Sequence, residues 1–202
     1  MNQVQRGLNG KGVYVVESNR FTPSQKSFFV ASSQVMNAAD ISRALTRIAH
    51  EILERNRGLQ DVVLIGLQSG GTPLAKQLQE ILYQITKQRI PLGILDIGFY
   101  RDDIALRPLQ SQAFTDISFD LSDKKVILVD DVLFTGRTVR AALNALVDYG
   151  RPQSVQLGVM IDRGHRELPI RPDFVGKNLP TRQDEVVEVS LDGVSLGQVV
   201  NP

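Results

Sequence analysis

The stretch Val126–Thr138, VILVDDVLFTGRT, decides the fold. It opens with aliphatic and β-branched residues, a composition typical of a strand buried on both faces of a parallel sheet. The acidic pair Asp130 and Asp131 follows, and a Thr-Gly-Arg-Thr turn then leads into a helical pattern. Ligands of open parallel α/β sheets bind beyond the carboxyl ends of the strands. The order of strand, acidic pair, glycine turn and helix therefore predicts a ligand site at this strand end.

The turn at residues 135–138 suits a phosphate. Its backbone N–H groups lie at a helix N-terminus, where the helix dipole favours an anion, and Gly136 allows close approach of the backbone. Asp130 and Asp131 suit ribose hydroxyls or an accompanying cation, so the whole segment predicts a ribose-5-phosphate site. It is not a P-loop, because Asp131 stands where that motif requires glycine. The alternative is an ordinary strand end with an acidic N-cap.

The rest of the chain alternates in the same way. Short apolar runs with β-branched residues are separated by stretches whose apolar residues recur every three or four positions. This alternation predicts an α/β fold, a Rossmann-like parallel sheet flanked by helices with right-handed crossovers. The expected strands are 61–66, 92–97, 125–129, 154–161 and a late strand at 185–191, and the expected helices are 40–58, one opened by Pro73, and 139–147.

Composition excludes several classes of protein. The 202 residues carry a net charge of +1, 42% are hydrophobic, and none is cysteine, which excludes disulfides, cysteine-ligated zinc and thiol nucleophiles. The longest apolar run is too short to span a bilayer, and residues 1–7 show no signal-peptide pattern. We therefore expect a cytoplasmic protein that makes no use of a membrane.

Two segments depart from the alternation. Residues 1–27 are rich in Gly, Gln, Asn and Ser and are expected to form an N-terminal extension, with one short strand at most, before a domain at 28–202. The polar segment 101–122 exceeds the usual length of a connection, which favours a lid that closes over a site and excludes water. A disordered insertion is the alternative.

Residues 126–138 resemble the signature of type I phosphoribosyltransferases, which bind phosphoribosyl pyrophosphate (PRPP) with magnesium. Three further stretches, 43–51 (RALTRIAHE), 100–103 (YRDD) and 162–178 (DRGHRELPIRPDFVGKN), narrow the resemblance to the PyrR family from about residue 28 onward. Members of this family are bifunctional regulators of pyrimidine operons with uracil phosphoribosyltransferase activity. The resemblance implies a type I fold with a flexible lid loop.

The resemblance also implies roles for individual residues. Uracil and PRPP would give UMP and pyrophosphate, with Mg²⁺ held mainly by PRPP, and Asp130, Asp131 and Arg137 would be catalytic. PRPP or nucleotide would contact Ser69, Gly70, Gly71, Tyr100, Arg101, Asp130, Asp131, Thr135, Gly136, Arg137, Thr138 and Arg163. The uracil base would lie near Phe174, Val175 and Leu179.

Two positions depart from the family pattern. PyrR proteins usually carry Thr-Arg-Gly where this chain has Ser69-Gly70-Gly71, and Gly70 thus removes a charge that could stabilise pyrophosphate. If that charge is the missing element, Gly70→Arg raises turnover. Phe134 replaces the usual tyrosine and argues against a purine substrate. The alternative function is an RNA-binding, nucleotide-sensing regulator with weak or no catalysis.

A basic face is the last prediction. Four residues lie on one stripe of the predicted helix at 40–58, away from its apolar side, and residues 163–182 carry a formal excess of three positive charges. Charge alone favours a solvated surface; the resemblance favours binding of pyrimidine-operon leader RNA and transcription attenuation. The expected RNA contacts are Arg43, Thr46, Arg47, His50, Arg166, Arg171 and Lys177. UMP and UTP are expected as ligands, and a homodimer or homotetramer as the assembly.

Overall fold

The computed structural model describes residues 15–17, 28–68, 70–97 and 115–200. Its centre is a five-stranded parallel sheet in the order β4-β3-β5-β6-β7. This sheet confirms the predicted α/β fold class. Its strands are β3 (Val62–Leu67), β4 (Leu92–Leu95), β5 (Lys125–Leu133), β6 (Ser154–Asp162) and β7 (Phe174–Asn178).

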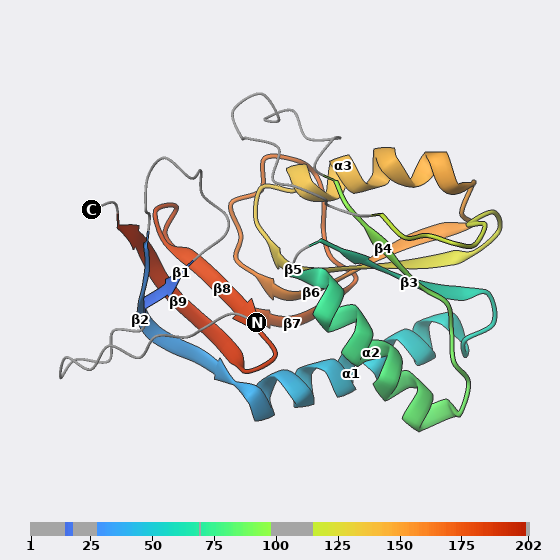
Figure 1. The fold of residues 1–202 in the computed structure, drawn as a ribbon, viewed down its shortest axis with the longest axis horizontal. Helices are drawn as coiled ribbons and strands as arrows, with labels where there is room; N and C mark the ends of the chain where they lie inside the picture. Colours follow the sequence, from blue (N-terminus) through green and yellow to red (C-terminus); the bar gives the residue numbers. More distant parts are fainter. Residues whose placement is uncertain (1–14, 18–27, 69, 98–114, 201–202) are drawn as a thin grey trace.

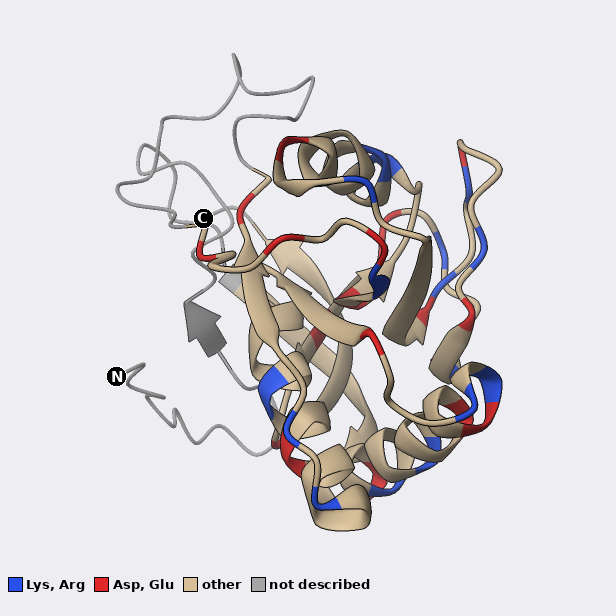
Figure 2. Ribbon diagram, turned by 90° about the vertical axis from the view of Figure 1, so that its right-hand side faces the viewer, with Lys and Arg blue, Asp and Glu red and all other residues tan. Residues whose placement is uncertain are grey.

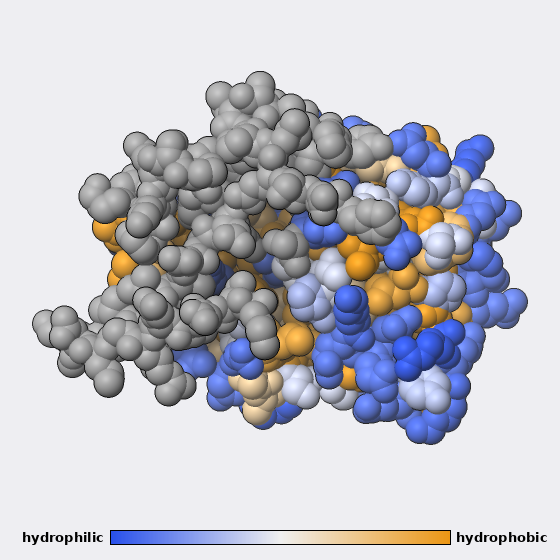
Figure 3. Space-filling view, in the orientation of Figure 1, coloured by the Kyte–Doolittle hydropathy of each residue, from blue (hydrophilic) through white to orange (hydrophobic). Residues whose placement is uncertain are grey.

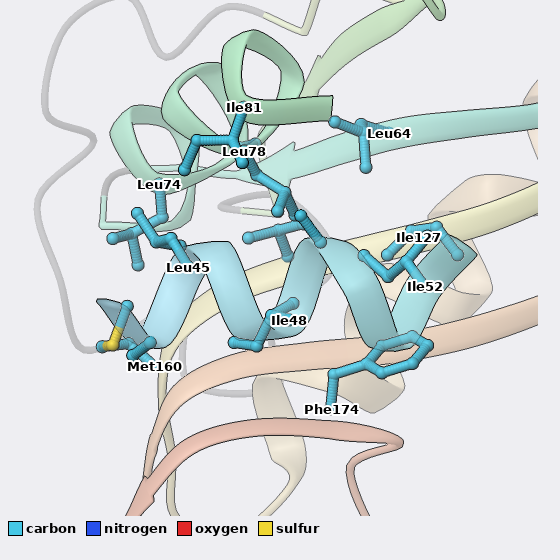
Figure 4. Packing of buried hydrophobic residues seen from close by; sticks show 14 of the residues in the cluster. Leu45, Ile48, Ile52, Leu64, Leu74, Leu78, Ile81, Ile127, Met160 and Phe174 are labelled. Carbon is cyan, nitrogen blue, oxygen red and sulfur yellow. The ribbon is translucent and has the colours of Figure 1, made fainter. Parts of the chain in front are cut away.

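Helices cover both faces of this sheet (Figure 1). On one face, α1 (Ala38–Asn56) and α2 (Gly71–Thr86) pack through their aliphatic sides against the inward residues of the strands. Figure 4 shows Leu45, Ile48 and Ile52 of α1 meeting side chains of α2 and the sheet. On the other face lies α3 (Arg137–Leu146), continued by the 3-10 turn Val147–Tyr149. Residues of β3 and β5 are buried on both sides, as their apolar composition requires.

A second sheet lies beside the first (Figure 1). It is antiparallel, in the order β1-β2-β9-β8, and the sequence predicted only two parts of it, the late strand and a short strand in residues 1–27. The late strand belongs to this sheet and not to the parallel one. The strands are β1 (Val15–Glu17), β2 (Phe28–Asn37), β8 (Val186–Ser190) and β9 (Gly193–Val200).

The predicted boundaries need three corrections. β5 continues to Leu133, so the acidic pair lies within the strand and not after it. β4 ends at Leu95, two residues before the predicted end. α2 begins at Gly71, so Pro73 lies in its first turn and does not open it. The segment predicted to be a lid lies outside the described residues between 98 and 114, whereas Asp116 bridges to Ile94 at the edge of the sheet.

The described surface is mainly hydrophilic, with scattered hydrophobic areas on the side that Figure 3 shows. Acidic and basic residues are scattered over the described part of the chain and do not form separate regions (Figure 2). Within the described ranges, no helix has both the length and the apolar character needed to cross a membrane.

Candidate active site

The order of the strands places a binding crevice between β3 and β5. From β3 the chain moves outward to β4, and it then returns to add β5, β6 and β7 on the opposite side. The loops that leave β3 and β5 therefore run in opposite directions from two neighbouring strands. In doubly wound sheets such a switch point is where ligands bind. The two loops are those that the sequence associates with pyrophosphate and with ribose phosphate.

The loop after β3 lies directly against the end of β5. A Cβ atom at Gly71 would overlap the carbonyl oxygen of Val129 and lie 3.0 Å from the Cα of Asp130. A Cβ atom at Gly70 would overlap the carboxylate of Asp131. The loop after β3 therefore packs tightly against the acidic pair, and this contact joins the two predicted halves of the site.

Asp130 and Asp131 are both buried, with 5% and 6% of their surface exposed. Each carboxylate accepts a hydrogen bond from the next backbone amide: Asp131 N–H donates to Asp130 Oδ1 at 2.9 Å, and Val132 N–H donates to Asp131 Oδ1 at 2.8 Å. Such bonds fix the side chains and offset part of the cost of burying them. The strand end therefore presents two oriented carboxylate groups.

Both helices that begin at this edge start without a side-chain cap. Gly70 precedes α2 and Gly136 precedes α3, and neither helix carries an acidic residue in its first turn. In contrast, α1 has a complete capping box between Asn37 and Asp40. A helix start with neither an N-cap side chain nor an acid leaves N–H groups and dipole charge available for an anion.

The turn at residues 135–138 is held by the loop that follows β6. Glu167 N–H and Leu168 N–H both donate to the carbonyl oxygen of Thr135, at 3.0 and 3.2 Å. Gly136 has φ +93°, in the left-handed region that favours glycine, and a Cβ atom there would lie 3.3 Å from Ile170 Cδ1 and 3.4 Å from Leu168 Cβ. The turn therefore has a defined shape that depends on a segment about thirty residues away in the chain.

Arg166 ties these two loops together. Its Nη1 donates to the carbonyl oxygens of Phe134 at 2.9 Å and Gly164 at 3.1 Å, and its Nε donates to Ile170 at 3.0 Å. Its Nη2 pairs with Asp162 Oδ2 at 2.5 Å, and both side chains are about four-fifths buried. A guanidinium that is committed to carbonyls and a carboxylate acts here as a support of the turn at residues 135–138.

A second buried arginine faces the residue just before that turn. The guanidinium of Arg163 lies over the ring of Phe134, 4.2 Å from its centroid, and the ring of His165 meets the same phenyl edge-on at 5.7 Å. Arg163 is 6% exposed and donates to Thr181 Oγ1 and to the carbonyl oxygen of Arg182. Burial lowers the pKa of Arg163 from its ordinary value, and the charge of Glu185 opposes that shift.

Comparison with known proteins assigns the family. The profile of the phosphoribosyl transferase domain matches residues 31–192. A "Bifunctional protein PyrR" from Roseiflexus sp. (strain RS-1) is 55% identical over 169 residues, which cover 83% of this chain and 92% of that protein. The chain belongs to the PyrR family. Another "Bifunctional protein PyrR", from Chloroflexus aurantiacus, is 58% identical over 165 residues, which cover 80% of this chain and 91% of that protein.

Solved structures agree on the fold of this PyrR-family chain. The hypoxanthine phosphoribosyltransferase of Trypanosoma cruzi in complex with the product IMP has a TM-score of 0.65 at 16% identity, covering 83% of this chain and 91% of that one. The enzyme from Staphylococcus aureus has a TM-score of 0.62 at 16% identity, covering 83% and 92%. At this level of identity the likeness concerns the fold, which is that of type I phosphoribosyltransferases.

The structure brings most of the predicted nucleotide contacts to one edge. Gly70, Gly71, the acidic pair and residues 135–138 adjoin at the switch point, and Arg163 follows β6 beside them. Ser69, Tyr100 and Arg101 lie outside the described residues. The Arg137 side chain is 56% exposed and pairs with Glu167 at 2.7 Å.

The predicted base pocket needs a correction. Phe174 is 2% exposed and belongs to the core, where its ring packs beside Ile48 and Ile52 of α1 (Figure 4) and under the guanidinium of Arg55. It opens β7 opposite Gly158, away from the carboxyl edge, and Val175 follows it in the strand. Leu179 does lie at that edge, since its N–H donates to the carbonyl oxygen of Asp162.

The predicted RNA-binding residues divide into two groups. Arg43, Thr46, Arg47 and His50 form an exposed stripe on α1, and Arg47 donates to the carbonyls of Val175 and Gly176, which places the stripe beside β7. The hydrogen bond from Asn37 N–H lowers the pKa of Asp40 most, and the charges of Arg43 and Lys177 lower it further, which places Lys177 near this stripe. Arg171 is exposed just before β7, whereas Arg166 belongs to the loop at the carboxyl edge.

Several residues of the site escaped the sequence analysis. Glu167 and Leu168 contact the turn through their backbone N–H groups, Thr181 accepts from Arg163 through its hydroxyl, and His165 meets Phe134 through its ring. No residue type marks such contacts, because they depend on which loops the sheet brings together. His165 adopts φ +59° in the Arg-Gly-His-Arg loop, a conformation that the sequence does not reveal.

Proposed function

We propose that this chain is a uracil phosphoribosyltransferase that joins uracil to PRPP, giving UMP and pyrophosphate, and that it also regulates pyrimidine genes through leader RNA. The observation that supports the catalytic half most strongly is the meeting of the acidic pair with two uncapped helix starts at the switch point. The name of the relatives, which declares two functions, favours this conclusion over a regulator without catalysis.

Each of the three parts of PRPP, the 5′-phosphate, the ribose and the pyrophosphate, has a matching group in the site. The N–H groups of residues 136–138 receive the 5′-phosphate, and Asp130 and Asp131 accept hydrogen bonds from the ribose hydroxyls. Pyrophosphate departs toward the start of α2, where the N–H groups of Gly70 and Gly71 face it. Because the transferred centre is cation-like, catalysis consists mainly of holding these groups in place and stabilising the leaving anion.

Magnesium fits this edge of the sheet. Mg²⁺ prefers carboxylate, phosphate and water oxygens and is commonly held by one or two carboxylates together with substrate phosphates. Asp130 and Asp131 supply two such oxygen donors, and no group of three or more His, Cys, Asp or Glu in the described ranges forms a complete protein cage. We therefore propose that these two residues flank an ion held mainly by PRPP. When bound, the ion neutralises charge on pyrophosphate.

The base pocket is proposed at the carboxyl ends of β5 and β6. Phe134 offers an aromatic surface, and Arg163, held above it, presents a planar set of donors that suits the carbonyl oxygens of uracil. Leu179 lies at the same carboxyl edge of the sheet, next to the end of β6. Phe134 has no proton-accepting group, so the proton on uracil N1 must leave to PRPP oxygens or to water.

For RNA, the proposed surface is the α1–β7 face, defined as Arg43, Thr46, Arg47, His50 and Lys177. Cations, a hydroxyl and an imidazole suit phosphates, 2′-hydroxyls and exposed bases of a folded RNA loop. Arg43 and Arg47 are paired with Asp40 and Glu51, so part of their charge is already neutralised. The partner is pyrimidine-operon leader RNA, and binding would act by transcription attenuation. UMP and UTP are the proposed effectors, and a homodimer or homotetramer is the proposed assembly.

The deciding experiment is a direct assay. Purified protein is given uracil, PRPP and MgCl₂, and UMP and pyrophosphate are followed together. The proposal expects equal amounts of both products and no turnover when EDTA removes the metal. UMP binding without any turnover would instead support a regulator that senses nucleotides. Hypoxanthine in place of uracil serves as the control and should give no product.

A further inference from the structure

Arg163 is a buried cation without a counter-ion. It is 6% exposed, and it forms no ion pair within the part of the chain that the structure describes. Its charge meets only neutral groups. Nε donates to Thr181 Oγ1 at 2.9 Å, Nη2 donates to the carbonyl oxygen of Arg182 at 2.7 Å, and the ring of Phe134 lies below the guanidinium at 4.2 Å.

Such an arrangement is costly in the free protein. Burying an ionised group without an opposite charge beside it is unfavourable. The neighbouring Arg166 avoids this cost by pairing with Asp162. The Nη1 of Arg163 also has no acceptor among the described residues. A buried cation with a donor left over therefore indicates a ligand group that carries or develops negative charge.

The position of Arg163 relates that charge to the base. Phe134, which its guanidinium covers, directly precedes the phosphate-binding turn at residues 135–138. Uracil must lose its N1 proton to form the bond to ribose, and no proton-accepting side chain stands at position 134. As the proton leaves, negative charge spreads from N1 onto the carbonyl oxygens of the base. A fixed cation in a site shielded from water stabilises such charge strongly.

We propose that Arg163 is a catalytic residue that stabilises the N1 anion of uracil during the attack on PRPP. The inference rests on the proposed function and names how the base is activated without a general base. The bond from N1 to C1′ forms from the electron pair of N1, and the bond from C1′ to pyrophosphate breaks with its electrons on pyrophosphate. The N1 proton passes to water or to a PRPP oxygen, and Arg163 keeps its own proton.

The first test compares two bases in Arg163→Gln. 5-Fluorouracil is a stronger acid at N1 than uracil and needs less help from a cation. We expect kcat to fall on the order of 100-fold with uracil but only about tenfold with 5-fluorouracil, while KM for PRPP stays unchanged. Equal losses with the two bases would overturn the proposal, because a purely structural defect does not depend on the acidity of the base.

The pH profile gives a second readout. A nearby cation favours the anionic form of the base, so kcat/KM for uracil should level off at a lower pH in the wild type than in Arg163→Gln. Arg151→Gln is the matched control, because Arg151 is exposed and precedes β6 at the opposite edge of the sheet. It should keep the wild-type profile. An Arg163→Gln profile that also levels off at the wild-type pH would overturn the proposal.

The last test needs neither turnover nor a variant. The N1 anion absorbs at a longer ultraviolet wavelength than the neutral base, so 5-fluorouracil is titrated with wild-type protein in the presence of ribose 5-phosphate. We expect the absorbance of the bound base to shift to longer wavelength at a pH where the free base is neutral. A bound base without this shift would overturn the proposal. If the shift appeared but uracil and PRPP gave no UMP, the proposed function would fall while the role of Arg163 stood.

Discussion

At the scale of the residue, burial of an acidic pair is the costly feature of this molecule. Ionised carboxylates are seldom left so far from water unless they are hydrogen-bonded or bind a ligand. Each of the two accepts a bond from the next amide, and both stand at the end of a strand where apolar residues would be more stable. This arrangement favours ligand binding over stability.

Replacing one of these acids tests whether the pair serves ligand binding at the expense of stability. Asp130→Asn keeps the shape of the side chain and removes its charge, which weakens its hold on the ribose hydroxyls. The value of kcat/KM for PRPP should therefore fall on the order of 100-fold, the usual cost of a poorly positioned reacting group. The melting temperature should stay the same or rise. Steady-state kinetics with varied PRPP give the first quantity and thermal unfolding gives the second.

The control for this change is Asp192→Asn, an exposed acid in the turn between β8 and β9. It should leave both kinetics and stability as in the wild type. An Asp130→Asn variant with normal kcat/KM would remove the carboxylate from the proposed mechanism.

At the scale of the element, the turn at residues 135–138 depends on the loop at 162–170. Arg166 is the main link, because it joins the carbonyl of Phe134 to the start and end of that loop. Arg166→Gln would leave buried carbonyls and Asp162 without their donor, at a cost of about 1–3 kcal/mol in the free energy of unfolding. Urea denaturation measures this loss, and UMP affinity should fall with it.

Arg171→Gln is the comparison, since Arg171 is an exposed arginine in the same segment. It should change neither quantity. If Arg166→Gln unfolded like the wild type and bound UMP normally, the support that we assign to Arg166 would be refuted.

The elements also show what a sequence can predict. Strands β3 and β5 consist mostly of Val, Ile and Leu, and β6 contains the mostly apolar run 157–161; all three were predicted near their observed positions. β2 and β9 were missed because Ser, Gln and Gly interrupt them, so that β2 keeps only a short apolar run at residues 28–31 and β9 keeps none longer than two residues. β7 was missed because five residues with Gly, Lys and Asn carry little preference for a strand.

The errors in the site follow from those in the elements. Without β7, no register placed Phe174 opposite Gly158 and away from the carboxyl edge. Arg166 was counted as a surface charge because charge counts do not reveal that a guanidinium faces carbonyls. In contrast, the acidic pair and the turn at residues 135–138 were predictable, since their residues are contiguous and their strand is strongly apolar.

At the scale of the whole molecule, RNA binding is proposed for a chain with a net charge of +1. Its affinity must then come from the local α1–β7 face, and it should fall steeply with salt. The expected log–log slope is about −0.7 for each single-stranded phosphate contacted. Arg43→Gln with Lys177→Gln should flatten the slope by about 1.4 and leave the synthesis of UMP unchanged, as filter binding across a salt series and the enzyme assay would show.

The control for this pair is Arg89→Gln. Arg89 is an exposed arginine, 56% accessible and paired with Glu80, that lies outside the α1–β7 face. It should leave the slope as in the wild type. A slope that the double variant does not alter would remove RNA binding from this surface.

The central claim is that the ribose and the 5′-phosphate of a nucleotide bind at the carboxyl end of β5. A crystal structure with UMP tests it most directly. We expect the 5′-phosphate within about 2.7–3.2 Å of the N–H groups of residues 136–138, and both ribose hydroxyls against Asp130 and Asp131. A well-ordered UMP bound elsewhere, with the turn at residues 135–138 left without phosphate, would contradict the account.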